Sequence, residues 1–128
     1  MNKIIVVLAL LAVCIFCTFP GKTVVYAKEP STPEELISHF AQIYGANEEL
    51  LQKVAYCESR YNYLARGDGG YAVGIFQFHQ PTWDSFSRDF GEELNIQSSY
   101  DQAKLASWAF SKGLQSHWTC TKIVLRGV

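Results

Sequence analysis

A single glutamate, Glu58, occupies a position on a predicted helix where an apolar residue is expected. Residues 48–60 have helical periodicity, and the apolar face formed by Leu51 and Val54 continues at Glu58. A carboxyl group on an apolar face is poorly solvated, which raises its pKa. A carboxylic acid that remains protonated near neutral pH can protonate a leaving-group oxygen. Glu58 is therefore a candidate general acid; the alternative is that it lies in the last helical turn and faces solvent.

A second group of candidate site residues follows Glu58 in the segment 71–78. Gly74 has no side chain and would let a ligand approach the backbone closely. The Gln77 amide can donate and accept hydrogen bonds toward an acetamido or hydroxyl group. Tyr71 and Phe76 are candidates to line a groove for a sugar or peptide, although aromatic residues more commonly fill the core. Together these residues predict a substrate-binding segment.

The N-terminal 27 residues predict export. A short cationic start precedes an uncharged apolar run over residues 4–19, and Pro20-Gly21 follows. The small residue Ala27 then provides a cleavage position for a signal peptide covering residues 1–27. The alternative is an uncleaved membrane anchor formed by residues 4–19, although this run is short for a span of roughly 20 residues. We therefore expect a secreted or extracytoplasmic protein, with any membrane contact made through this segment.

Export determines how the cysteines are interpreted. Cys14 and Cys17 belong to the N-terminal segment, so Cys57 and Cys120 are the two that remain. An even pair of cysteines in an exported chain predicts a disulfide. Closing so long a loop would stabilise the fold by on the order of 4 kcal/mol in the chain-entropy model.

Two other catalytic chemistries are disfavoured. A cysteine peptidase could pair Cys57 with His79 or His117. However, Cys57 lies near the C-terminus of its predicted helix, where the helix dipole raises a thiol pKa, and a disulfide would remove the nucleophile. The histidines, His39 included, have no metal-binding spacing. No metal and no cofactor are predicted.

Size and charge limit the domain count and the partners. Removing residues 1–27 leaves about a hundred residues, enough for one small domain. This part carries nine basic and twelve acidic residues, a net charge of −3, without a basic cluster. Nucleic acid is therefore not an expected partner.

The elements that must position these residues are mainly helices. The residues 28–45 form an N-terminal helix, and residues 46–128 form the remaining domain. Four helices are predicted, the first from the Thr32–Glu35 capping box to Gly45, the second from the Asn47 cap to Arg60, the third from Pro81 to Gly91, and the fourth from Ser99, capped together with Gln102, to Gly113. Helical periodicity is absent over residues 60–79, where glycines indicate turns and a short hairpin is expected over residues 71–76.

The segments Cys57-Glu58-Ser59 and 74–77, with Trp118 and Cys120 near the C-terminus, resemble the lytic transglycosylase and goose-type lysozyme family. The match is to the small bacterial branch in which the cysteine beside the catalytic glutamate pairs with one near the C-terminus, and it covers roughly residues 46–120. The resemblance implies a mainly α, lysozyme-like α+β domain with a small irregular β-hairpin or loop region after the catalytic helix.

The resemblance also implies roles for individual residues. Glu58 would be the catalytic acid, Ser59 would help to position the glutamate and the substrate, and Gly74 and Gln77 would line the cleft around the scissile sugar. The implied partner is the peptidoglycan glycan strand, bound by a monomer without a cofactor. The implied reaction is cleavage between N-acetylmuramic acid and N-acetylglucosamine, without water, to a 1,6-anhydromuramic product.

One family motif is missing. Many lytic transglycosylases carry a Tyr-Asn-x-Gly motif late in the domain, and the comparable stretch here is Phe110-Ser111-Lys112-Gly113. The groups that assist Glu58 therefore stay open. Two alternatives to transglycosylation follow, which are a hydrolytic lysozyme and a catalytically silent peptidoglycan-binding module.

Asp68 is the candidate second carboxylate that a hydrolytic enzyme would need. Glycosidases that use two carboxylates place them about 5–5.5 Å apart for retention and about 6.5–9.5 Å apart for inversion. In the run Gly67-Asp68-Gly69-Gly70, however, an aspartate commonly caps its own turn. A single-acid mechanism based on Glu58 is the preferred interpretation.

Overall fold

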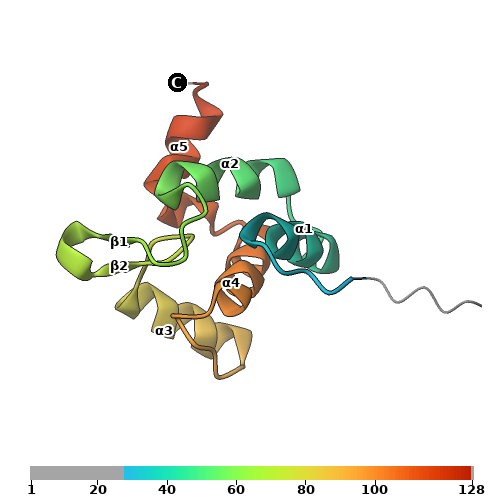
Figure 1. Cartoon of the computed structure of the whole chain (residues 1–128), viewed down its shortest axis with the longest axis horizontal. Helices are drawn as coiled ribbons and strands as arrows, with labels where there is room; N and C mark the ends of the chain where they lie inside the picture. Colours follow the sequence, from blue (N-terminus) through green and yellow to red (C-terminus); the bar gives the residue numbers. More distant parts are fainter. Residues whose placement is uncertain (1–27, 128) are drawn as a thin grey trace, which may run out of the picture.

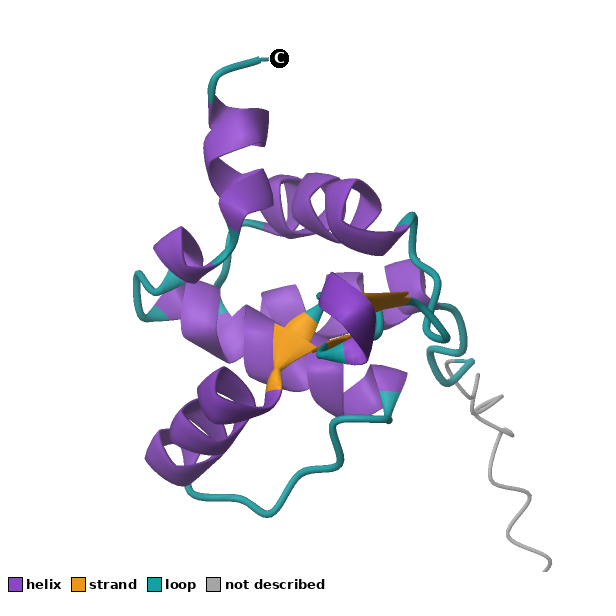
Figure 2. Ribbon diagram, turned by 90° about the vertical axis from the view of Figure 1, so that its left-hand side faces the viewer, coloured by secondary structure: helices purple, strands orange, loops and turns teal. Residues whose placement is uncertain are grey.

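The computed structural model describes residues 28–127, which form a mainly helical domain with one small sheet, as predicted (Figures 1 and 2). The α-helices are α1 (Pro33–Tyr44), α2 (Glu48–Ser59), α3 (Gln80–Phe90), α4 (Ser99–Ser111) and α5 (Thr119–Leu125). The strands are β1 (Arg66–Gly67), β2 (Ala72–Val73) and β3 (Phe78–His79), and two short 3-10 helices are η1 (Asp68–Gly70) and η2 (Gln115–His117). The predicted signal peptide or anchor lies outside the described residues.

The first two helices begin at the caps predicted from the sequence. The Thr32 side chain accepts a hydrogen bond from the Glu35 backbone N–H at 3.2 Å, and the Glu35 carboxylate accepts from the Thr32 backbone N–H. Asn47 accepts from the Leu50 N–H at the start of α2, at 3.0 Å. Because these caps satisfy backbone donors that have no partner inside the helix, they define where each helix starts.

The predicted cap of the fourth helix is wrong by one residue. Ser98, not Ser99, is the N-cap of α4, and its hydroxyl accepts from the Asp101 N–H at 3.2 Å. Ser99 is the first helical residue. Gln102 lies on the side of α4 that faces the interior, where it is 1% exposed. The predicted Ser99–Gln102 cap does not form because the Gln102 amide has hydrogen-bond partners inside the protein.

One hydrophobic core joins the helices. In Figure 1, α1 lies against α4, and α2 lies beside α1 and α5. The buried side chains from α1 (Leu36, Ile37 and Phe40) belong to the same cluster as Leu51 and Val54 of α2. The helix over residues 33–44 therefore packs into the core that supports α2.

The sheet differs from the hairpin predicted over residues 71–76. Its strands lie between residues 66 and 79, and each strand has only two residues. Its three two-residue strands are antiparallel in the order β1-β2-β3, with Gly67 opposite Ala72 and Ala72 opposite His79. In Figure 1, the β1–β2 hairpin extends away from the helices. The second turn, residues 74–77, returns toward the core.

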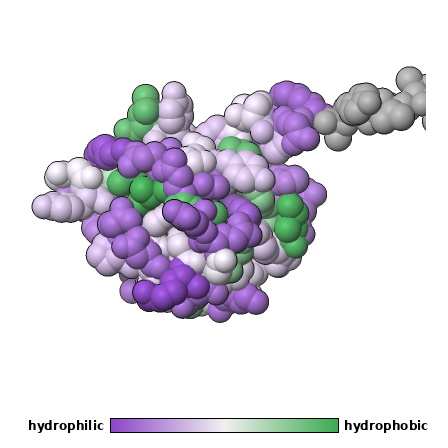
Figure 3. All heavy atoms as spheres, turned by 90° about the horizontal axis from the view of Figure 1, so that it is seen from below, coloured by the Kyte–Doolittle hydropathy of each residue, from purple (hydrophilic) through white to green (hydrophobic). Residues whose placement is uncertain are grey.

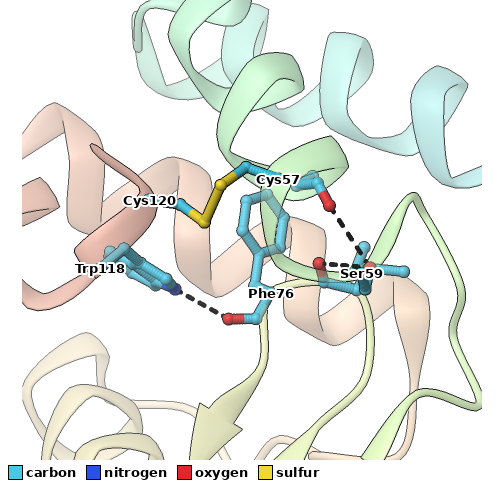
Figure 4. Close-up of a disulfide and its surroundings, with 7 residues drawn as sticks. Cys57, Ser59, Phe76, Trp118 and Cys120 are labelled. Carbon is cyan, nitrogen blue, oxygen red and sulfur yellow. Dashed lines mark hydrogen bonds between the residues drawn. A yellow bond between two sulfur atoms is a disulfide. The ribbon is translucent and has the colours of Figure 1, made fainter. Parts of the chain in front are cut away.

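The C-terminal helix α5 was not expected from its sequence, which contains several β-branched residues and has no side-chain cap. It is tied to α2 by the predicted disulfide between Cys57 and Cys120, whose Cα atoms lie 5.9 Å apart (Figure 4). α5 also packs against α2. Its helical state is therefore supported by tertiary contacts.

The face of the protein seen in Figure 3 is mostly hydrophilic, with a few separate apolar patches. Between residues 28 and 127, no helix has both the length and the apolar character required to cross a membrane.

Candidate active site

A cleft of about 730 Å³ brings together side chains from four parts of the chain: the end of α2, the sheet, the start of α3 and the segment before α5. Its size is within the range usual for small-molecule sites. The residues that line it are Glu58, Asp68, Ala72, Gln77, Phe78, His79, Pro81, Thr82, His117, Trp118 and Thr119. Both candidate carboxylates therefore lie in the same cleft.

Glu58 is half-buried in the last turn of α2 and lines the cleft. Burial raises the pKa of Glu58, and the negative charge of Asp68 raises this pKa further. The Cys120 backbone N–H and His79 act in the opposite direction. Since burial is the largest of these effects, Glu58 holds its proton to a higher pH than an ordinary glutamate does.

The disulfide places the first turn of α5 beside Glu58. Cys57 precedes Glu58 on α2, and its partner Cys120 follows Trp118 and Thr119, which line the cleft. The link therefore joins the helix that carries the acid to another wall of the same cleft.

Asp68 pairs with His79 instead of capping its own turn. The His79 Nε2 and the Asp68 Oδ2 lie 2.8 Å apart. In the sheet register, Gly67 and His79 are paired with Ala72 from opposite sides, so the Asp68–His79 contact connects the two edges of the sheet across β2. Asp68 has a left-handed backbone with φ of 49°, a region that asparagine and aspartate tolerate better than most residues. Both side chains are substantially exposed, so the pair adds little to stability, but it lies in the cleft that holds Glu58.

Ser59 supports the site without lining the cleft. Its hydroxyl donates to the Ile75 carbonyl oxygen at 2.9 Å and lies 3.4 Å from the Ala55 carbonyl oxygen (Figure 4). The contact with Ile75 ties the residue after Glu58 to the turn over residues 74–77. Ser59 can therefore influence Glu58 through the backbone.

Of the four substrate-binding residues predicted in the segment 71–78, Gln77 is the one that lines the cleft. Its side-chain nitrogen donates to the carbonyl oxygens of Gly74 and Ala65, at 2.9 and 3.3 Å. The Gln77 oxygen lies against Gly67, where a Cβ atom would collide with it, so the Gln77 amide also fixes the turn next to β1.

The other three predicted substrate-binding residues lie elsewhere or act differently. Phe76 is completely buried in the core, where its ring packs against those of Phe78 and Trp118. Tyr71 is 77% exposed on the hairpin and is not part of the cleft lining. Gly74 is buried, and the group that approaches its backbone is the Gln102 side chain, not a ligand. The turn points its apolar side inward, which the sequence did not indicate.

Several cleft residues were not singled out from the sequence as members of this site: Thr82, His117, Thr119 and, as a partner of Asp68, His79. A usable signal existed for part of this set. Because Cys57 adjoins Glu58, the predicted disulfide implies that residues just before Cys120 lie near Glu58. No comparable local signal indicated His79, whose position depends on the strand register.

Phe110 and Ser111, which occupy the stretch compared above with the Tyr-Asn motif of lytic transglycosylases, do not line the cleft. Phe110 is buried against Trp118, with ring centroids 5.1 Å apart, and Ser111 is exposed and donates to the Trp108 carbonyl oxygen. Neither side chain is therefore placed to act beside Glu58.

Within residues 28–127, no three histidine, cysteine, aspartate or glutamate side chains are grouped so that they could hold a metal ion. Comparisons of the chain with protein-family models, curated proteins and solved structures found no match. The chemistry of the cleft is therefore the basis for assigning a function.

Proposed function

We propose that this protein cleaves the glycan strands of peptidoglycan between N-acetylmuramic acid and N-acetylglucosamine, and that Glu58 is the proton donor. The observation that carries the proposal is a half-buried carboxyl group of raised pKa on the wall of a 730 Å³ cleft. A neutral carboxylic acid in such a place can protonate a glycosidic oxygen. A lysozyme-like fold, in which an acid at the end of a helix precedes a small antiparallel sheet, is part of the same proposal.

The proposed reaction uses Glu58 twice. In the first step, the Glu58 proton moves to the glycosidic oxygen, the bond from that oxygen to C1 of the muramic sugar breaks, and the sugar's own acetamido oxygen stabilises the positive centre at C1. In the second step, the Glu58 carboxylate removes the proton of the muramic 6-hydroxyl, whose oxygen bonds to C1. The products are a free 4-hydroxyl and a 1,6-anhydro ring, and Glu58 is protonated again.

Hydrolysis is the second candidate function, favoured by the position of Asp68 in the same cleft. In that case a water molecule attacks C1, and Asp68, held by His79 at 2.8 Å, provides the second carboxylate. A binding module without turnover is the third candidate. It would have no use for a carboxyl group whose charged form is disfavoured by burial.

Mass spectrometry of the fragments released from purified peptidoglycan tests the proposal. Anhydromuramic ends support the Glu58-only reaction, and reducing ends, heavier by one water, support hydrolysis. Glu58→Gln should abolish release with either product, while Glu49→Gln is a matched control, since Glu49 lies on the first turn of the same helix outside the cleft. Asp68→Asn should leave anhydro products within about fivefold of wild type, but should abolish reducing ends if hydrolysis operates. Retained release by Glu58→Gln would contradict the proposal.

We further propose that the protein acts outside the cytoplasm, as a monomer, either secreted or tethered by residues 4–19. Cell fractionation with an antibody against the domain tests this placement. Recovery of the protein in the cytoplasmic fraction would contradict it.

A further inference from the structure

Gln102 is a buried polar side chain of α4 with hydrogen bonds to three separate backbone positions. Its side-chain oxygen accepts from the Phe76 N–H at 3.0 Å. Its nitrogen donates to the carbonyl oxygens of Val73 and Ile96, at 2.9 and 2.7 Å. The side chain is 1% exposed, so these bonds form away from water, where a lost partner is costly. One amide therefore links α4 to both ends of the turn that follows β2.

Only a glycine at residue 74 leaves room for the Gln102 amide. The φ of Gly74, 76°, is left-handed, and a Cβ atom added there would lie 2.3 Å from the Gln102 nitrogen and 2.8 Å from its oxygen. A side chain at residue 74 would thus collide with the amide that holds the turn. The glycine and the glutamine fit each other as a pair, which gives the turn one position relative to α4.

The same turn contacts the cleft from its other side. The Ile75 carbonyl oxygen accepts from Ser59, the residue after Glu58, at 2.9 Å. The Phe76 carbonyl oxygen accepts from the Trp118 ring N–H at 2.9 Å, and Trp118 lines the cleft (Figure 4). The turn therefore connects Gln102, which lies outside the cleft lining, to the helix end that carries Glu58 and to the wall beside α5.

We propose that Gln102 is a positioning residue for the cleft: by holding the turn that follows β2 through two backbone hydrogen bonds, to Val73 and Phe76, it sets the placement of Glu58 relative to the other cleft walls. The proposal deepens the proposed function and rests on it where activity is the readout. Misplacement of a catalytic group by about 1 Å can lower turnover about 100-fold. Loss of Gln102 therefore acts on turnover beyond its effect on stability.

The test compares Gln102→Met with Gln52→Met in the full chain. Gln52 is a matched control, because its amide nitrogen also makes two hydrogen bonds, to the Glu34 carbonyl oxygen at 2.9 Å and to Ser38 at 3.1 Å, but these join α2 to α1 outside the cleft. Fragment release is measured well below both melting temperatures. We expect kcat of Gln102→Met to fall about 10- to 100-fold, with KM changed less than about threefold and with Gln52→Met within about twofold of wild type.

A second readout does not depend on the reaction. NMR titration of the Glu58 carboxyl carbon measures its pKa in each variant, and only Gln102→Met should move that pKa toward the ordinary glutamate value, because a loosened turn admits water to Glu58. If wild type releases no fragments, the proposed function fails and this titration still decides the role of Gln102. Equal behaviour of the two variants in activity and titration would overturn the positioning role.

A further variant covers the case in which Gln102→Met does not fold. Gly74→Ala keeps the amide but forces the turn away from it, and it should give the same lowered kcat and the same movement of the Glu58 pKa. A folded Gly74→Ala protein with wild-type kcat and Glu58 titration would also overturn the proposal.

Discussion

Removal of the Cys57–Cys120 disulfide should destabilise the protein strongly. The two cysteines are 63 residues apart in the sequence. In the chain-entropy model, a cross-link that closes a loop of this length stabilises the folded state by about 4 kcal/mol. For a domain of about a hundred residues, 1 kcal/mol corresponds to roughly 4–8 °C in Tm, so the double variant Cys57→Ser/Cys120→Ser should melt about 16–32 °C lower.

Thermal unfolding followed by circular dichroism at 222 nm measures this change. Each single serine variant breaks the same cross-link, so the two single variants and the double variant should lose nearly the same stability instead of adding their effects. Wild type in reducing agent provides a further control and should melt close to the double variant. A thiol assay on the unfolded wild type should find Cys57 and Cys120 unreactive until reductant is added.

Activity should respond differently from stability. At temperatures well below the lowered Tm, packing of α5 against α2 still holds the cleft together, so turnover of the double variant should stay within a few fold of wild type. A Tm that is the same with and without reductant, or a double variant that loses less than about 1 kcal/mol, would refute the reasoning that this link supplies a large part of the stability.

Three further predictions concern single residues. Glu58→Gln should abolish turnover and raise stability at neutral pH. Because the pKa of Glu58 is raised in the folded protein, wild type loses stability as pH rises through this folded pKa, whereas the glutamine variant does not. Measurements of Tm against pH should show that the variant's advantage vanishes below the unfolded pKa of about 4.3. Backbone N–H groups at the start of α1 lower the pKa of Glu35 to about 2. The contribution of Glu35 to stability is therefore present above the unfolded pKa of about 4.3 and is lost as pH falls toward 2. Glu35→Gln should remove this part of the acid sensitivity when Tm is measured against pH, and an unchanged acid profile would contradict the capping role. Gly74→Ala should cost about 1–3 kcal/mol more in urea unfolding than Gly45→Ala, since both glycines have positive φ but only Gly74 meets another side chain; equal losses would show that the contact has no effect.

Much of the helical framework could be predicted because its signals are local. The caps at Thr32 and Asn47, and the glycine that ends α1, act within one turn of the helix they define. The start of α4 was misjudged by one residue because adjacent serines can both cap a helix, and the choice depended on where the Gln102 side chain found partners. The helix α5 was missed because its residues favour extended structure locally and its support comes from α2.

The candidate site divides in the same way. The sequence by itself indicated Glu58 as the candidate acid and Cys120 as the disulfide partner of Cys57, because an apolar helix face and a cysteine count require no knowledge of distant contacts. Only the tertiary structure decided that Asp68 meets His79 across the sheet and that Phe76 is in the core. These outcomes depend on strand register and on which side of a turn is buried, and both are set by packing between segments far apart in the sequence.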